Sequence, residues 1–305
     1  MTHEEFVQLS LTPLLIGCLA SVSCALLGSF LLLRRQSLMG DAISHVVLPG
    51  IVGAFLLTGA TSALAMMGGA LAAALVAVGL IETIRRFGRV EPGAAMGVVF
   101  TSLFAVGVLW LERSGASGIH LDVEHVLYGN LESMVWLAAD GWPALWDPAA
   151  LELLPPQLPR LAGVLAIVLV FLALGWRTLV VATFDADFAS SIGARPGATG
   201  IVLLILVAAS TVAAFEAVGA IIVVAMFICP AATARLLTDR LLPQLLWSTL
   251  CAVVAAVSGY LLAAHGPFWL GYDASVSAAG MIAVMSGLLL AAACLWGPHR
   301  GAAQG

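Results

Sequence analysis

Asp41 and His45 stand four residues apart in the stretch MGDAISHVVLPG, residues 39–50. On an α-helix this spacing places both side chains on one face, one turn apart. A carboxylate oxygen and an imidazole nitrogen both bind Mn²⁺, Zn²⁺ and Fe²⁺, so the pair has half of the ligands that one divalent cation needs. The spacing leaves an alternative open, in which Asp41 caps the helix and His45 packs against a neighbour.

The sequence around this pair is apolar. Residues 6–33 carry no charge, and after His45 the next charged residue is Glu82. A charged side chain at the centre of a bilayer costs about 2.5–3.5 kcal/mol on insertion scales, so such groups face a cavity or a partner. We therefore expect the pair to have a function within the membrane.

The composition predicts an all-α integral membrane protein. Of its 305 residues 62% are hydrophobic and only 10% are charged, whereas soluble domains have about 25% charged residues. Helices of about 20 apolar residues span a bilayer with all backbone groups satisfied. We expect one multi-pass domain over 1–305 with about nine spans, or eight if a single broken helix covers 215–219. The nine are 12–33, 38–58, 62–84, 92–112, 161–182, 197–215, 217–238, 244–264 and 275–297.

The arginines predict the orientation. All 12 basic residues are arginine, and with the N-terminus outside ten of them are cytoplasmic, leaving only Arg113 and Arg160 outside. Basic residues concentrate on the cytoplasmic side of membrane proteins. We therefore expect a cytoplasmic C-terminus, an outer loop at 113–160 and a cytoplasmic segment at 183–197.

Other acidic and imidazole side chains fall in the predicted outer regions. Four of them lie within residues 118–130 and predict a mouth that attracts cations, unless this is an ordinary solvated loop; they are His120, Asp122, Glu124 and His125. Glu216 lies at the outer end of two spans, where it either caps a helix or lines the entry path.

Several catalytic motifs are absent from the sequence. It has no G-x-x-x-x-G-K-[ST] nucleotide loop and no lysine, and it lacks G-x-S-x-G, H-E-x-x-H and C-x-x-C. We expect a non-enzymatic protein with no covalently bound cofactor and no nucleic-acid partner. If ATP drives transport, another chain must bind the nucleotide.

Five segments, in this order, resemble the membrane permeases of ATP-binding-cassette importers for manganese, zinc and iron. They are MGDAISHVVLPGIVGAFLL (39–57), EPGAAMGVVFTSLFAVGVL (91–109), LDVEHVLYGN (121–130), TFDADFASSIGA (183–194) and EAVGAIIVVAMFICPAATARLLTDR (216–240). The resemblance covers nearly the whole chain. One departure is the stretch 131–160, which is longer than usual in the family.

The resemblance implies a permease in the plasma (inner) membrane of a prokaryote. Its partners would be a second permease copy, identical or similar, an ATP-binding subunit and an extracytoplasmic metal-binding protein. The family's metal ligands correspond to Asp41 and His45. A short cytoplasmic helix would dock in a groove of the ATP-binding subunit; its residues are Phe184, Asp185, Phe188, Ala189 and Gly193.

Two other functions compete with this one. An ATP-independent channel or secondary transporter would use Asp41 and His45 in the same way, but it would not need 183–197 as a contact for an ATPase. A membrane scaffold without transport activity would have no need of Asp41 within the bilayer.

Overall fold

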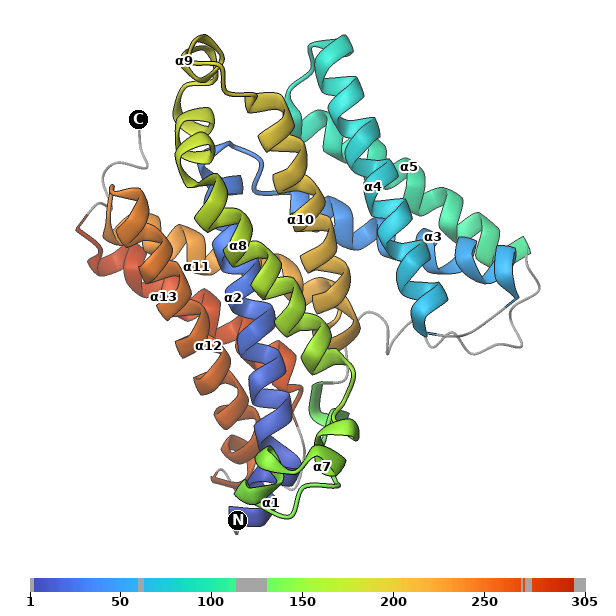
Figure 1. Cartoon of the computed structure of the whole chain (residues 1–305), viewed down its shortest axis with the longest axis vertical. Coiled ribbons are helices and arrows are strands. Elements are labelled where there is room, and N and C mark those ends of the chain that lie inside the picture. Colours follow the sequence, from blue (N-terminus) through green and yellow to red (C-terminus); the bar gives the residue numbers. More distant parts are fainter. Residues whose placement is uncertain (1–2, 60–62, 114–130, 270, 272–275, 299–305) are drawn as a thin grey trace.

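The computed structural model describes residues 3–59, 63–113, 131–269, 271 and 276–298. Every regular element in these ranges is a helix (Figure 1). The long ones are α2 (Thr12–Leu33), α3 (Met39–Thr58), α4 (Ala63–Gly88), α5 (Pro92–Arg113), α8 (Gln157–Phe184), α10 (Pro196–Val218), α11 (Ala220–Leu237), α12 (Leu241–Trp269) and α13 (Ala278–Trp296). The short ones are α1 (His3–Phe6), η1 (Val7–Leu11), η3 (Leu131–Ser133), η4 (Trp142–Trp146), α7 (Pro148–Glu152) and α9 (Ala186–Ser191).

The nine predicted spans coincide with the nine long helices. Among the described residues, eight helices are long and apolar enough to cross a membrane, and α11 contributes a shorter apolar helix, Ile222–Leu237. The uncertain boundary at 215–219 separates two helices, because α10 ends at Val218 and Gly219 has a φ of 79°. A residue in this left-handed region interrupts a helix, and glycine adopts it at little cost.

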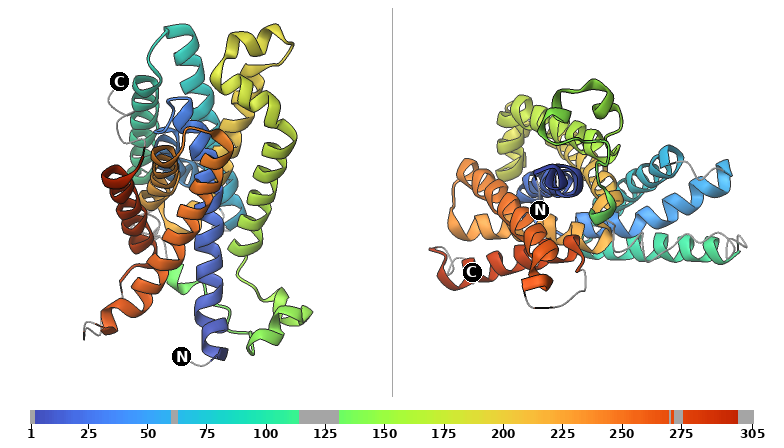
Figure 2. Two further views of the ribbon diagram at one scale, coloured as in Figure 1. Left: turned by 90° about the vertical axis from the view of Figure 1, so that its left-hand side faces the viewer. Right: turned by 90° about the horizontal axis from the view of Figure 1, so that it is seen from below.

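Helix α2 lies at the centre of the bundle. It contacts α8, α10, α11 and α12, which enclose it in the view along the bundle (Figure 2). Ile16, Leu27 and Phe30 on this helix are fully buried. An apolar helix without a polar face is typical of one that other helices surround.

Helices α3, α4 and α5 form a second group beside this bundle, and α10 and α11 connect it to the rest through contacts with α3. Within the group, α3 and α4 cross at Gly50 and Gly69. A Cβ atom on Gly69 would lie 2.4 Å from the Gly50 carbonyl oxygen, so a larger residue would separate the helices. Such close crossings of small residues are common between membrane helices.

The N-terminal end of α2 is covered by part of the segment predicted as the outer loop. Trp136 is fully buried there, and its indole Nε1 donates a hydrogen bond to the Ala150 carbonyl at 2.9 Å. The backbone N–H of Trp136 also donates to the Gln8 carbonyl at 2.8 Å. Residues 131–156 are therefore a packed cap on this end of the bundle, and α9 lies at the opposite end (Figure 1).

Candidate functional site

Asp41 lies in the first turn of α3. Leu38 is the N-cap residue and makes no side-chain capping bond, while Asp41 stands three residues further on. The capping alternative for Asp41 is therefore wrong. A carboxylate in the first turn still interacts favourably with the positive end of the helix dipole.

The two candidate ligands face each other across one helical turn. His45 Nε2 lies 3.4 Å from Asp41 Oδ1. This separation exceeds that of an ordinary hydrogen bond. Four residues further along, Pro49 has no N–H to donate to the His45 carbonyl, so the helix lacks that backbone hydrogen bond beside the pair.

The His45 ring packs against α5. It stacks on Phe100 with ring centroids 5.2 Å apart and an interplanar angle of 21°, and it meets Phe104 edge-on at 6.0 Å. These contacts hold the imidazole in one orientation. Neither phenylalanine was predicted from the sequence, although their i, i+4 spacing within the stretch 91–109 is a usable signal.

The Asp41–His45 pair is open at the surface of the chain. The side chain of His45 is 41% exposed and that of Asp41 is 31% exposed. Among the residues that the structure describes, no three His, Cys, Asp or Glu side chains come together as a possible metal site. The described part of one chain therefore provides two ligands of these kinds at this position.

The predicted outer mouth is only partly described. Its loop members lie outside the described residues; they are His120, Asp122, Glu124 and His125. Glu216, the remaining member, forms an ion pair with Arg160 on α8, whose Nη1 lies 2.9 Å from Oε2 and 3.1 Å from Oε1. Gln157 Nε2 donates a further hydrogen bond to Glu216 at 3.0 Å. Both charges are partly exposed, and the pair joins α10 to the start of α8.

The predicted coupling residues form a helical turn between α8 and α10. Phe184 ends α8, and the Asp185 carboxylate caps α9 by accepting a 2.8 Å hydrogen bond from the Phe188 N–H. Phe184 and Phe188 are 62% and 54% exposed, whereas Ala189 is completely buried against its own chain. Gly193 follows with a φ of 81°, which turns the chain toward α10.

Comparisons with known proteins agree with this architecture. The sequence profile of the ABC 3 transport family matches residues 6–136 and 149–296. The manganese transport system membrane protein MntD of Bacillus subtilis is 40% identical over 93% of this chain and 91% of its own length. The zinc transport system membrane protein TroD of Treponema pallidum is 37% identical over 96% of this chain and 75% of its own. A solved structure of PsaBC from Streptococcus pneumoniae in complex with Fab superposes with a TM-score of 0.73 at 25% identity, covering 95% of this chain and 92% of that one.

Proposed function

The chain belongs to the ABC 3 transport family and is the non-catalytic, multi-pass permease subunit of a bacterial ABC-type importer of metal ions (manganese, zinc or iron), in which we propose that Asp41 and His45 bind the ion as it crosses the membrane. The observation that carries this proposal is the pair itself, a carboxylate and an imidazole 3.4 Å apart in a stretch with no other charged residue between Arg35 and Glu82.

The separation of the two ligand atoms suits one shared cation. Two ligands about 2.1 Å from a metal lie about 3.4 Å apart at a tetrahedral angle and about 3.0 Å apart at a right angle. The observed 3.4 Å between His45 Nε2 and Asp41 Oδ1 lies within this range. Both groups can therefore bind a single ion with little movement, and Phe100 keeps the imidazole oriented for it.

A second permease copy would complete the coordination. Asp41 and His45 are exposed on the surface that α3 and α5 present, so the same pair of another copy can approach them. Two copies would bring two carboxylates and two imidazoles, and the two negative charges would balance one divalent cation. Charges in the membrane interior are tolerated when they are paired in this way.

The short helix α9 is proposed to transmit the action of ATP. The exposed rings of Phe184 and Phe188 provide an apolar knob for a groove in an ATP-binding subunit, as amphipathic helices do in groove recognition. The buried Ala189 fixes α9 to its own chain, where α9 contacts α8 and α10. A movement of the docked subunit would therefore pass directly to two membrane helices.

The proposed direction of transport is from the α7 end of the bundle to the α9 end. The arginine distribution supports an outer N-terminus and a cytoplasmic α9. An extracytoplasmic metal-binding protein would then deliver the ion to the end that residues 131–156 cover. A tag at Gly305 that reacts with an impermeant reagent outside intact cells would contradict this orientation.

Metal uptake by Asp41→Asn tests the proposal. The substitution keeps the size of the side chain and removes its charge, so we expect uptake of manganese, zinc and iron to fall to near background. Copurification of the ATP-binding subunit should persist and serves as the control for folding. Uptake at the wild-type rate would refute the ligand role. Uptake that continues without the ATP-binding subunit would instead favour an ATP-independent channel.

A further inference from the structure

A basic cavity of about 420 Å³ lies at the α9 end of the bundle, where α2, α4, α8 and α10 meet. It is separate from the proposed metal site, because neither Asp41 nor His45 lines it. Among the described residues, its charged lining consists of four arginines and a single acid: Arg34, Arg35, Arg85, Arg86 and Glu82. These five side chains carry a net charge of +3.

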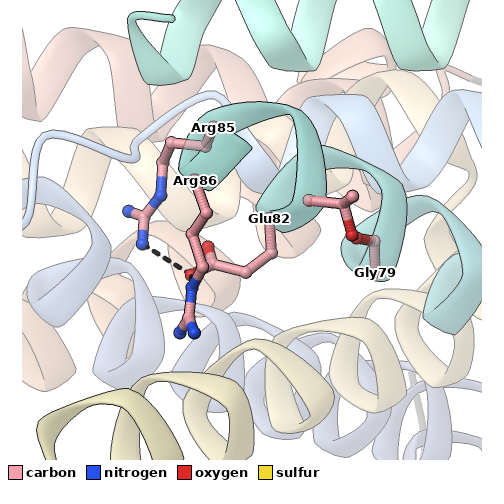
Figure 3. A network of polar contacts seen from close by, with 5 residues as sticks. Gly79, Glu82, Arg85 and Arg86 are labelled. Atoms are coloured by element: carbon pink, nitrogen blue, oxygen red, sulfur yellow. Dashed lines mark hydrogen bonds and ion pairs between the residues drawn. The ribbon is translucent and has the colours of Figure 1, made fainter. Parts of the chain in front are cut away.

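The one acid in the cavity is already shared between two of the arginines. Glu82 Oε1 accepts hydrogen bonds from Arg85 Nη2 at 2.8 Å and from Arg86 Nε at 2.6 Å, and both arginines converge on it (Figure 3). A single carboxylate cannot neutralise four guanidinium groups. The cavity therefore retains a positive potential that favours an anion.

Arg34 shows most directly that an acceptor is missing. Its Nε donates to the Thr183 hydroxyl at 3.1 Å, but its Nη2 is buried and has no hydrogen-bond partner among the described residues. Burial lowers the pKa of Arg34, and the positive charge of Arg85 lowers it further. Leaving a charged donor buried and unpaired is costly, so such groups in native proteins generally have a partner.

The first turn of α10 adds to this positive character. A Cβ atom on Gly200 would lie 3.1 Å from Arg34 Nη1, and one on Gly197 would lie 3.3 Å from Arg86 Nη2. The two guanidinium groups thus lie against the first two turns of a 23-residue helix. The first of these turns has free N–H groups and the positive end of the helix dipole. The two guanidinium groups repel each other and the positive end of the helix dipole, and an anion between them would offset this repulsion.

An apolar track leads away from the cavity along α10. Ile201, which lines the cavity, and Ile205 are 42% and 40% exposed on one face of this helix. The same face continues to Val212 in a second, mainly apolar cavity of about 490 Å³ between α4 and α8, lined also by Leu71 and Val164. Figure 1 shows α10 lying between these two helices.

We propose that this surface binds one anionic phospholipid, with its phosphate among Arg34, Arg35, Arg85 and Arg86 and its acyl chains along α10 between α4 and α8. A basic recess that opens onto an apolar track matches a molecule with a charged head and long tails. Free inorganic phosphate would satisfy the arginines but would leave the track unoccupied.

Arg35 provides a clean test, because its backbone favours glycine. Its φ is 56°, and it occupies the left-handed position that ends α2, with the Gln36 N–H bonded to the Leu31 carbonyl at 2.8 Å. Arg35→Gly therefore removes the side chain without straining the fold. Arg89 is a matched control, since it also has a positive φ, 50°, follows the end of α4 and does not line the cavity.

The experiment uses the full-length chain purified with its ATP-binding subunit. The complex is reconstituted in vesicles of equal phosphatidylglycerol and phosphatidylcholine, extracted in 0.5 M NaCl to screen general attraction, and its bound lipids are identified by native mass spectrometry. The wild-type complex should retain phosphatidylglycerol in several-fold excess. Arg35→Gly should lower that excess about fivefold, the usual effect of one basic residue at an anionic surface, and Arg89→Gly should leave it unchanged.

Three results would overturn the proposal. The first is an equal loss of phosphatidylglycerol in Arg35→Gly and Arg89→Gly, which would show general attraction only. The second is complete displacement of the lipid by 10 mM inorganic phosphate, which would assign the cavity to a free anion. The third is loss of the ATP-binding subunit from Arg35→Gly with lipid retention intact, which would make the cavity a protein contact. Ile205→Gln should weaken lipid retention if the acyl chains follow α10.

Discussion

Replacing His45 with alanine should weaken metal binding by an amount that depends on how many permease copies carry the change. One chain contributes one imidazole and one carboxylate, 3.4 Å apart, and its described part offers no third ligand of these kinds. If two copies form a four-ligand site, a complex of two mutant copies loses two ligands. A complex with one mutant copy loses only one.

The magnitude follows from the strength of four-ligand sites. Structural zinc sites bind with about 10–16 kcal/mol, or about 2.5–4 kcal/mol per ligand on average. One His45→Ala copy should therefore raise the dissociation constant roughly 10²- to 10³-fold, since about 1.4 kcal/mol corresponds to a factor of ten. Two mutant copies should lose about 5–8 kcal/mol, which lowers the affinity beyond detection in most assays.

Tandem fusions of two permease copies allow this comparison. Metal binding would be measured by calorimetry on purified fusions with no, one or two His45→Ala copies. His45→Phe is the control for packing, because it keeps an aromatic ring against Phe100 but lacks a nitrogen. We expect it to bind as weakly as alanine. Equal affinities for fusions with one and two mutant copies would refute the shared site, and wild-type affinity in His45→Phe would refute ligation.

Three further predictions concern the rest of the chain. Phe188→Asp should abolish copurification of the ATP-binding subunit, whereas Ser190→Asp, a control on the same exposed helix, should retain it. Equal retention of the subunit by both variants would exclude docking through the Phe188 ring. Glu216→Gln should lower the free energy of unfolding by only about 1 kcal/mol, because the ion pair that it removes is partly exposed. A loss of uptake without a change in thermal stability would instead place Glu216 on the entry path. Gly69→Ala should destabilise the permease by about 1–3 kcal/mol, since its Cβ would meet the backbone of α3. Gly68→Ala should leave the stability unchanged, because a Cβ atom there has no atom within 4 Å. Thermal unfolding that fails to separate the two variants would contradict the close crossing of α3 and α4.

The sequence alone determined where the helices lie and placed the two proposed metal ligands on one helical face. Bilayer thickness sets the length of an apolar span, and an α-helix satisfies its backbone bonds within its own segment. The nine long helices could therefore be predicted without knowing how they pack. Asp41 and His45 meet for an equally local reason, because residues four apart share a helical face.

Only the tertiary structure decided which distant residues meet. It placed Phe100 against His45 from another helix, paired Glu216 with Arg160, and gathered Arg34 and Arg85 around one cavity. It also showed that Leu38, rather than Asp41, occupies the N-cap position of α3. These contacts depend on close packing between segments far apart in the chain, and an apolar helix has little in its own sequence to indicate which of its neighbours each face will touch.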